Sequence, residues 1–400
     1  MLIVPMEQVQ AGMKLAVSVS HPDQPDHDLL KAGFELTREV IARLRDLGVE
    51  NIYVDYPDLG DLDKHMAAYL SPERQKVYEQ VRDAMTAVQR QAKPTCPFND
   101  YYDATRELIL TLMRQGEHAI YLDQMSGKLG GHAVAHATAV SHLSLMLGLR
   151  LETYLVQQRQ RLTAAHAREV VNLGVAGMLH DIGVAQLPPA ARKFSRVNVP
   201  EDKALWAEWQ THPQRGYDLI KGGVEATAAN AVLHHHQHFD GTGFPYMPVK
   251  PGDEPRNVGE RIHIFPRILA AADLYDRLTV GETGNRRSNI EILHLMNTQY
   301  AATLDPMVLR VVPAVIPPFP PGMTVNLNDG TDAVVIAMNP QRPYQPKVRR
   351  IVDLATFKLG GPVLDMSLQS TLRIDRIGSK EIADMVPADS VTTTRAVNAA

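Results

Sequence analysis

Apolar residues recur at intervals of three and four along the middle of the chain, from about residue 131 to residue 312. Val140, Leu143 and Leu147 form one such stripe, and residues 170–179 present a broad apolar face. Residues 267–276 are rich in leucine and alanine, as a buried helix would be. Because this spacing places side chains on one face of a helix, it predicts a mainly helical body.

The first part of the chain follows a different pattern. Residues 13–19 alternate as a strand does, Thr37 can cap a short helix that stops at Gly48, and residues 49–54 read as another strand. These features predict a small α+β accessory module over residues 1–66. His21 and His27 stand among prolines and aspartates, which favours a loop over a metal site.

Two further helices are expected between this module and the helical body. Apolar stripes place them at residues 72–91 and 99–114, with a proline-rich break between them. They would form a connecting segment over residues 67–114. Their apolar faces could carry a dimer or a signal, but packing onto the chain's own helices is the favoured interpretation.

The last part of the chain predicts β structure. A proline-rich connector, residues 313–321, leads into the apolar runs 324–327 and 333–337, which flank Asp329 and Gly330. Two apolar runs around an Asp-Gly pair indicate a β-hairpin, and residues 348–352 can add a strand. We expect a C-terminal β extension and tail over residues 313–400, with the last dozen residues loosely ordered. The predicted fold class is mainly α.

Composition narrows the class of protein. A chain of 400 residues predicts two or three domains, and 44% hydrophobic with 22% charged residues is typical of a globular protein. A formal charge of -4 argues against nucleic acid or a membrane surface as partner. Cys96 is the one cysteine, so no internal disulfide can form, and no apolar run reaches membrane-span length. A cytoplasmic protein is expected.

Four of the sixteen histidines lie within five positions, in the run 234–238. A second chemical motif is the pair His180 and Asp181 at the end of an apolar helix. Adjacent imidazoles and carboxylates suit a divalent metal, since both bind through N or O. A solvated histidine run is the alternative, and the internal position argues against an expression tag. The run enters a turn-forming motif loop that contains Asp240, Gly241, Gly243, Phe244 and Pro245.

Two histidines on one predicted helix are also candidates. His132 and His136 are four residues apart and therefore share a face, and His136 lies on the apolar stripe. A single histidine there would usually be a core group, so at this spacing the core and ligand interpretations both stay open. His142 lies off that face and is left out.

Three later residues complete the candidates. His212 precedes a proline and therefore stands at a helix junction. Asp273 is surrounded by leucine and alanine, so it needs either a metal or an arginine partner. Asp276, one turn further, is interpreted as an ion-pair or capping residue.

In their order and approximate spacing, these residues resemble the HD-GYP family over about residues 115–312. That family is a branch of the HD-domain metal phosphohydrolases that hydrolyses the bacterial messenger cyclic di-GMP. The resemblance implies an all-helical domain with two or three iron or manganese ions, of which we expect two here, and in which His180 and Asp181 are the catalytic pair and Asp181 bridges the metals. The implied ligands are His136, His180, Asp181, His212, His235, His236 and Asp273. His132 stands where some members have a ligating glutamate, which makes a third metal doubtful.

The chain also departs from the family pattern. Val184 stands where the family has a phosphate-binding lysine, Gln237 replaces a glutamate and Phe244 replaces the motif tyrosine. Since a charge-assisted hydrogen bond contributes roughly 1.5–3 kcal/mol, loss of the lysine should slow turnover about ten- to a hundredfold. Arg286 and Arg287 are the candidate basic residues for substrate phosphate.

Three functions follow as hypotheses. The first is a metal-dependent cyclic di-GMP phosphodiesterase of reduced rate, giving the linear dinucleotide or GMP. The second is a binding module with metals in place, which holds the nucleotide or meets a diguanylate cyclase through the motif loop. Hydrolysis of another nucleotide is the third. A homodimer is compatible with each of them.

Overall fold

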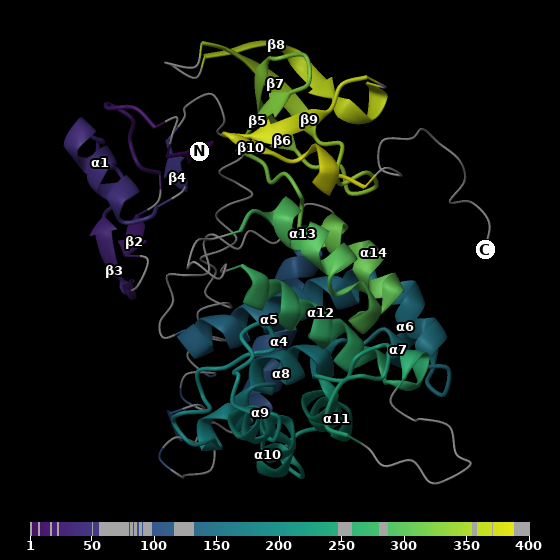
Figure 1. Cartoon of the computed structure of the whole chain (residues 1–400). Helices are drawn as coiled ribbons and strands as arrows, with labels where there is room; N and C mark the ends of the chain where they lie inside the picture. The colour runs from purple at the N-terminus through teal and green to yellow at the C-terminus, as the bar shows by residue number, and fades with distance from the viewer. Residues whose placement is uncertain are drawn as a thin grey trace. The chain divides into compact units, whose positions relative to one another are not determined.

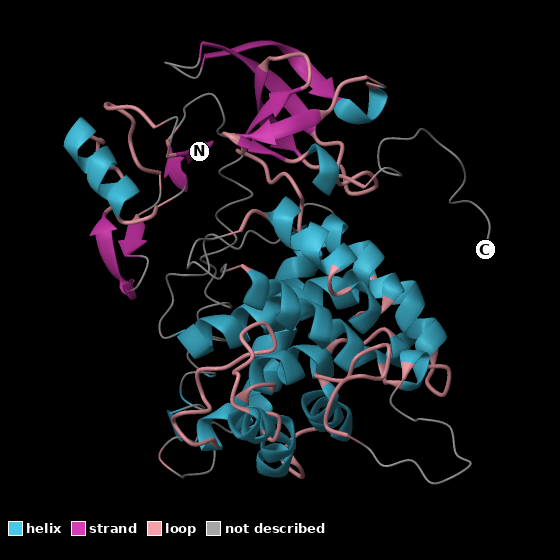
Figure 2. Ribbon diagram, viewed as in Figure 1, coloured by secondary structure: helices cyan, strands magenta, loops and turns pink. Residues whose placement is uncertain are grey.

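The computed structural model describes residues 2–6, 9–16, 18–21, 24–49, 51–55, 80, 83, 86–87, 90, 98–115, 132–246, 258–279, 287–353, 358–369 and 371–387. The chain divides into two compact units. The helical unit comprises Tyr69–Val280 and Leu295–Val315, and the mixed unit comprises Met1–Ala68, Gly281–His294 and Ile316–Ala400. Figure 1 labels their elements, and Figure 2 distinguishes helices from strands.

The helical unit confirms the prediction of a mainly α body. Its helices are α4 (Phe98–Gln115), α5 (His132–Arg150), α6 (Glu152–Gln158), α7 (Ala164–Ala167), α8 (Val171–Leu179), α9 (Lys203–Trp209), α10 (His212–Ile220), α11 (Ala226–His234), α12 (Ile264–Leu278) and α14 (Pro306–Val315). Short 3-10 turns are η5 (Ile182–Gln186), η6 (Gly259–Arg261) and η7 (Ala301–Thr303), and α13 (Asn289–Thr298) belongs partly to each unit. α4 packs on α8, as the sequence favoured.

Small residues bring α8 close to α5. A Cβ atom on Gly177 would lie 2.5 Å from Cα of Ser141, so only glycine allows this approach. Ser141 donates a hydrogen bond from Oγ to the carbonyl of Gly174 across 2.9 Å. The two helices are thereby fixed near the ends that carry His136 and His180.

α12 is buried from Ile264 to Tyr275, as its apolar composition predicts. Its one buried arginine, Arg267, pairs with Asp305 at the start of α14 and donates to the hydroxyl of Tyr154 at 2.8 Å. Both charged side chains are at most 2% exposed. Because a buried charge is costly without a partner, this pair holds α12 in one position against α6 and α14.

The C-terminal part of the mixed unit is a six-stranded antiparallel sheet in the order β10-β9-β5-β6-β7-β8. The predicted hairpin is confirmed as β5 (Thr324–Leu327) and β6 (Asp332–Ala337), and the third strand as β7 (Lys347–Asp353). The sheet is larger than the hairpin extension predicted. Three further strands are present: β8 (Lys358–Asp365), β9 (Ile374–Ile377) and β10 (Lys380–Glu381). The hydrophobic pattern did not predict them because they are short or rich in glycine and charged residues.

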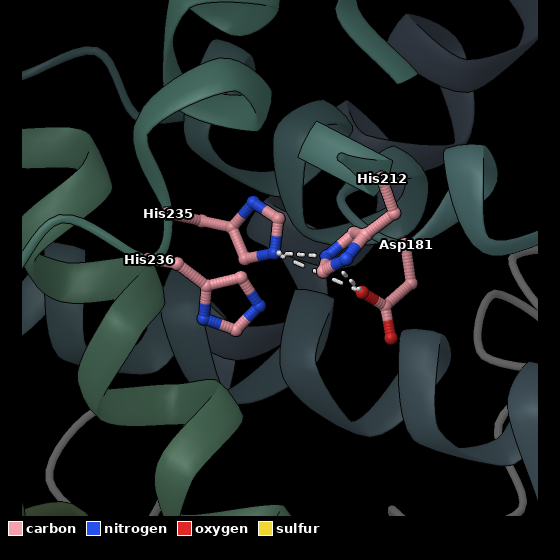
Figure 3. A group of neighbouring side chains, drawn as sticks. All are labelled: Asp181, His212, His235 and His236. Carbon is pink, nitrogen blue, oxygen red and sulfur yellow. Dashed lines mark hydrogen bonds and ion pairs between the residues drawn. The ribbon is translucent and has the colours of Figure 1, made fainter. Parts of the chain in front are cut away.

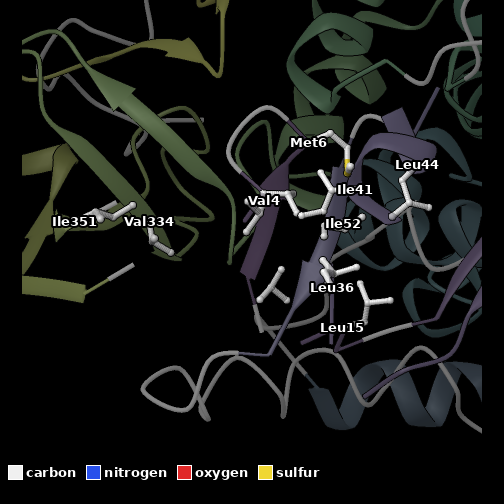
Figure 4. Packing of buried hydrophobic residues seen from close by; sticks show 11 residues of the cluster. Val4, Met6, Leu15, Leu36, Ile41, Leu44, Ile52, Val334 and Ile351 are labelled. Atoms are coloured by element: carbon white, nitrogen blue, oxygen red, sulfur yellow. The ribbon is translucent and has the colours of Figure 1, made fainter. Parts of the chain in front are cut away.

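The N-terminal module pairs β1 (Leu2–Pro5) with β4 (Asn51–Val54), antiparallel. Helix α1 (Arg38–Asp46) begins at Thr37, whose side chain accepts a hydrogen bond from Val40 N at 3.3 Å, as predicted. Figure 4 shows the apolar side chains that the module buries. They are Val4, Met6, Val9, Leu15, Leu36, Ile41, Leu44, Ile52 and Val54.

Two sequence expectations for this module are wrong. The strand predicted over residues 13–19 is reduced to isolated bridges at Lys14 and Leu15, and the loop predicted around His21 and His27 is instead β2 (Val19–His21) paired with β3 (Gln24–Leu30). A two-stranded ribbon is held by backbone hydrogen bonds, so it forms here from residues without apolar alternation.

Some expectations fall on residues that are not described. Most of the helix predicted at 72–91, Cys96 and the last dozen residues lie outside the described ranges. Among the residues that are described, no helix combines the length and the hydropathy that crossing a bilayer requires.

Candidate metal centre

Six of the predicted ligands lie in two groups that share Asp181. The three-histidine group is Asp181, His212, His235 and His236, and the two-histidine group is His136, His180 and Asp181. Within each group the candidate ligand atoms lie within 4.8 Å of one another, and every member is buried. Figure 3 shows the three-histidine group, with its side chains drawn from separate segments toward one another.

Helix ends orient three of the imidazoles. Nδ1 of His180 lies 2.9 Å from the carbonyl of Gly177, Nδ1 of His212 lies 2.7 Å from that of Trp209, and His235 repeats this contact with the residue three positions earlier at 2.7 Å. A carbonyl only accepts, so each Nδ1 donates. Nε2, the other ring nitrogen, is therefore the one that faces the cluster and can ligate a metal.

The three-histidine group consists of electron-pair donors that face one another. Nε2 of His212 lies 3.3 Å from Nε2 of His235, and these atoms lie 3.3 and 3.7 Å from Oδ1 of Asp181. Both ring nitrogens of buried His236 lack a hydrogen-bond partner. Converging acceptors without a proton between them repel, whereas a divalent cation would satisfy all of them. The residues present therefore fit a metal ion.

Asp181 serves both groups because its two oxygens face different ways. Oδ1 points to His212 and His235, and Oδ2 lies 3.6 Å from Nε2 of both His136 and His180. Burial opposes ionisation, but the positive charge of Arg277 beside it holds the pKa of Asp181 well below its usual range. An ionised carboxylate in this position can bridge two cations.

The two-histidine group contains a charged imidazole. Nδ1 of His136 lies 2.6 Å from Oδ2 of Asp276, and its Nε2 lies 3.2 Å from Oδ1 of Asp273. Burial and Arg277 disfavour the imidazolium, yet the hydrogen bonds to these two carboxylates raise the pKa of His136 to about 9. By contrast, burial lowers the pKa of His180 to about 4, so that ring is neutral.

Two arginines beside the cluster were missed by sequence reasoning. Arg277 pairs with Oδ2 of Asp181, and its Nε lies 3.4 Å from Oδ1 of Asp273. Arg196, 5% exposed, donates to the carbonyl of Ala270 at 3.0 Å and lies 3.9 Å from Oδ2 of Asp273. Asp273 therefore has the arginine partners that its burial requires. The only sequence signal for Arg277 was its spacing of four residues from Asp273.

An aromatic wall closes one side of the three-histidine group. Trp206 stacks on Trp209 at 4.8 Å between ring centroids, and Phe244 stacks on His236 at 4.7 Å. Val184, on η5, packs against this wall. The position predicted to have lost a phosphate-binding lysine is therefore occupied by an apolar contact.

The motif loop is held by side-chain hydrogen bonds. Gln237 is buried and donates from Nε2 to the carbonyl of Pro245 at 2.6 Å, and Asp240 accepts from the Thr242 amide at 3.0 Å. A Cβ atom on Gly243 would lie 2.3 Å from the carbonyl of His236, so the loop needs glycine to pack beside the cluster. Gly241 has a φ of 83°, which favours glycine.

Four further residues singled out in the sequence are His132, Arg286, Arg287 and Asp276. His132 begins α5, but the structure does not describe its side chain, and Arg286 lies outside the described residues. Arg287 precedes α13 in the mixed unit, so its contact with substrate phosphate stays a prediction. Asp276 is confirmed as an ion-pair residue, with His136 as its partner.

The HD domain family model matches residues 134–308, a range that contains every member of both groups. This region is an HD domain. The match confirms the resemblance drawn from the motifs, and an HD domain with these histidines and carboxylates binds divalent metal ions.

Curated proteins are similar to the chain, over most of its length in one case. Over 413 aligned residues, the chain is 25% identical to "Cyclic di-GMP phosphodiesterase PA4108" of Pseudomonas aeruginosa, covering 95% of this chain and 92% of that protein. It is 31% identical to "Cyclic di-GMP phosphodiesterase response regulator RpfG" of Xanthomonas campestris pv. campestris over 114 residues, 28% of this chain and 27% of the relative.

Two further similarities are more distant. The chain is 22% identical over 216 residues to "Cyclic di-GMP phosphodiesterase PdeB" of Borreliella burgdorferi, covering 51% of this chain and 50% of that one. A solved structure, the HDG"Y"P protein Bd1817 of Bdellovibrio bacteriovorus, has 17% identity and a TM-score of 0.40, and the match covers 77% of this chain and 97% of that chain.

Proposed function

We propose that the HD domain hydrolyses cyclic di-GMP, with water opening one phosphodiester bond to give the linear dinucleotide and, after a second cut, GMP. The observation that carries this proposal is the convergence of imidazole nitrogens and carboxylate oxygens in two buried groups that share Asp181. Three relatives named as cyclic di-GMP phosphodiesterases support the choice of substrate.

Each part of the cluster would have a distinct task. Bound divalent ions would lower the pKa of a water molecule and neutralise charge that develops on the phosphoryl oxygens. His212, His235, His236 and Oδ1 of Asp181 would hold one ion, and His136, His180, Oδ2 of Asp181 and Asp273 face a second position. Nitrogen and carboxylate ligands suit iron or manganese, and we propose one of these as the native metal.

The protein's own charges would bind and orient the substrate. Arg196 has a buried Nη2 without a hydrogen-bond partner, so it has a donor left for an anion. Val184 supplies no such donor, which is why we propose a reduced rate. The aromatic wall of Trp206, Trp209 and Phe244 would keep bulk water from one side of the three-histidine group.

A direct assay tests the proposal. The purified chain is stripped of metal, loaded with Mn²⁺ or anaerobically with Fe²⁺, and incubated with cyclic di-GMP, and the products are separated by chromatography. We expect linear dinucleotide or GMP from the wild type, none from Asp181→Ala, and wild-type rates from Asp218→Ala, which removes an exposed carboxylate paired with Lys221. The absence of any product, even with enzyme in stoichiometric amount, would contradict the proposed phosphodiesterase activity.

A binding module is the second candidate, and the apolar contact of Val184 favours it. Tight binding of cyclic di-GMP without turnover would support this function, and hydrolysis of another cyclic nucleotide alone would support the third hypothesis. A diguanylate cyclase docked on the motif loop stays a prediction. Asp240, Gly241 and Thr242 are exposed there, so substituting them should abolish co-purification with such a cyclase.

A further inference from the structure

The two groups of the cluster differ in the charges that already surround them. In the three-histidine group, Nε2 of His212 and of His235 face Oδ1 of Asp181, and His236 has no hydrogen-bond partner. In the two-histidine group, the guanidinium of Arg277 pairs with Oδ2 of Asp181 and lies 3.4 Å from Asp273. Oδ2 of Asp181 is therefore already paired with a guanidinium, whereas Oδ1 faces the imidazoles of His212 and His235.

The guanidinium of Arg277 has the geometry to replace a metal ion. Its planar fork presents several N–H donors in fixed directions, so it can neutralise two carboxylates at once. Asp181 and Asp273 are 7% and 2% exposed, and two ionised carboxylates buried this close require positive charge between them. Arg277 itself is 21% exposed and is the least buried of these three side chains.

We infer that Arg277 holds the second cation position of the cluster, so that the chain binds one divalent ion tightly, in the three-histidine group. This inference rests on the metal binding of the proposed function and revises its count from two ions to one. A divalent ion in the two-histidine group would have to displace the guanidinium from both carboxylates. Its binding is therefore weakened by loss of those pairs and by repulsion between like charges.

Metal counting tests the inference without any measurement of turnover. The chelator-stripped full chain is titrated with Mn²⁺, and bound metal is counted by elemental analysis and calorimetry. We expect one tight equivalent in the wild type and two in Arg277→Met, which keeps much of the side-chain length but removes the charge. The second equivalent should bind at least about tenfold tighter in the variant, because unit charges about 4 Å apart interact by several times the thermal energy near a protein surface.

Spectroscopy adds an independent measurement. Electron paramagnetic resonance of the Mn²⁺-loaded wild type should show isolated ions, whereas Arg277→Met should show the exchange coupling of two neighbouring ions. Arg168→Ala is the matched control, because it removes an arginine–carboxylate pair of 2.9 Å with Glu152, 54% exposed and outside the cluster. This control should still bind one equivalent.

Loss of Arg277 should also destabilise the metal-free protein, because Asp181 and Asp273 lose a shared partner. Without metal, the thermal unfolding temperature of Arg277→Met should lie below that of the wild type. Added Mn²⁺ should raise it again. If Arg277→Met does not fold, Arg277→Lys replaces it, since a single ammonium cannot span both carboxylates and should also admit a tighter second ion.

The outcomes separate this inference from the proposed function. Two tight equivalents in the wild type, or one in both Arg277 variants, would overturn the inference and leave phosphodiesterase activity standing. One equivalent in the wild type and two in a variant would support it, even if neither protein hydrolyses cyclic di-GMP. No bound metal in any of these proteins would overturn both.

Discussion

His136 and Asp276 are 140 residues apart in the chain, and their side chains meet across 2.6 Å between Nδ1 and Oδ2. The imidazole comes from α5 and the carboxylate from the end of α12. Because the carboxylate binds Nδ1, the opposite nitrogen, Nε2, is directed at His180 and Asp181. Asp276 is therefore a positioning residue for a candidate ligand.

In the Arg277→Met background, Asp276→Asn should weaken binding of the second Mn²⁺ about ten- to a hundredfold, since partners that orient a ligand histidine usually contribute this much. The amide keeps an acceptor for Nδ1 but loses the charge that favours the ring orientation. Calorimetric titration with Mn²⁺ measures the change, and Asp218→Asn, on the exposed side of α10, should leave the affinity as it is. Equal affinity in both variants would show that Asp276 does not orient a ligand.

Val184→Lys should raise the rate of cyclic di-GMP hydrolysis about ten- to a hundredfold, because a charge-assisted hydrogen bond to phosphate contributes roughly 1.5–3 kcal/mol. Val184 is half-buried, so a lysine stem can follow the aromatic wall and place its ammonium in solvent. The comparison is Val184→Met, which adds length without charge. If both variants change the rate alike, packing rather than phosphate contact explains the effect.

Acid should destabilise the helix that carries Asp273. His263 caps α12, and its Nδ1 accepts a hydrogen bond from the Phe265 amide at 3.2 Å, which requires a neutral ring. Burial, aided by Arg159 and Arg267, lowers the pKa of His263 to about 4. Its ordinary pKa of about 6.5 applies to the unfolded chain, so the stability from this cap is full above about pH 6.5 and is lost as pH falls through 4.

His263→Asn tests this directly, since asparagine caps a helix without titrating. Thermal unfolding is measured from pH 7 to pH 4. Over this range the free energy of unfolding of the wild type should fall by on the order of 2 kcal/mol more than that of the variant. The metal cluster is common to both proteins and cancels in the difference. Replacement of the exposed His166 on α7 should reproduce the wild-type profile, and a variant as acid-sensitive as the wild type would refute the role of the cap.

Gly183→Ala should disturb the cluster without changing any candidate ligand. A Cβ atom at this position would lie 2.1 Å from the carbonyl of His212 and 2.5 Å from the amide of Gly216, so η5 and α10 would have to separate. We expect a loss of at least about 2 kcal/mol of stability and weaker metal binding. Chemical denaturation and Mn²⁺ titration measure both, with Gln186→Ala, an exposed side chain on the same turn, as control.

Apolar spacing predicted the helical body. The candidate residues stood out because they place polar or charged side chains in apolar segments, where an unpartnered polar group is costly to bury. Asp273 within an alanine-rich helix and His180 beside Asp181 at a helix end each needed partners, and the structure places such partners next to them. Arg277 was missed because an arginine in the last turn of a helix is common there, where it complements the helix dipole. Only the fold shows that it reaches Asp181, 96 residues earlier.

The β structure was less predictable for a related reason. β5, β6 and β7 bury apolar side chains, whereas β8 has glycine at 360 and 361 and little burial. β2 and β3 pair through polar residues. Where backbone pairing rather than side-chain burial forms a strand, the alternation that predicts strands is missing.

The hydrogen bonds that tie His180, His212 and His235 to carbonyls three residues earlier make each ring a rigid continuation of its own chain segment. The distances between the candidate ligands therefore depend on how whole helices pack against one another. Substitutions deep in the seam between α5 and α8, such as at Gly177, should therefore alter ion selectivity from a distance.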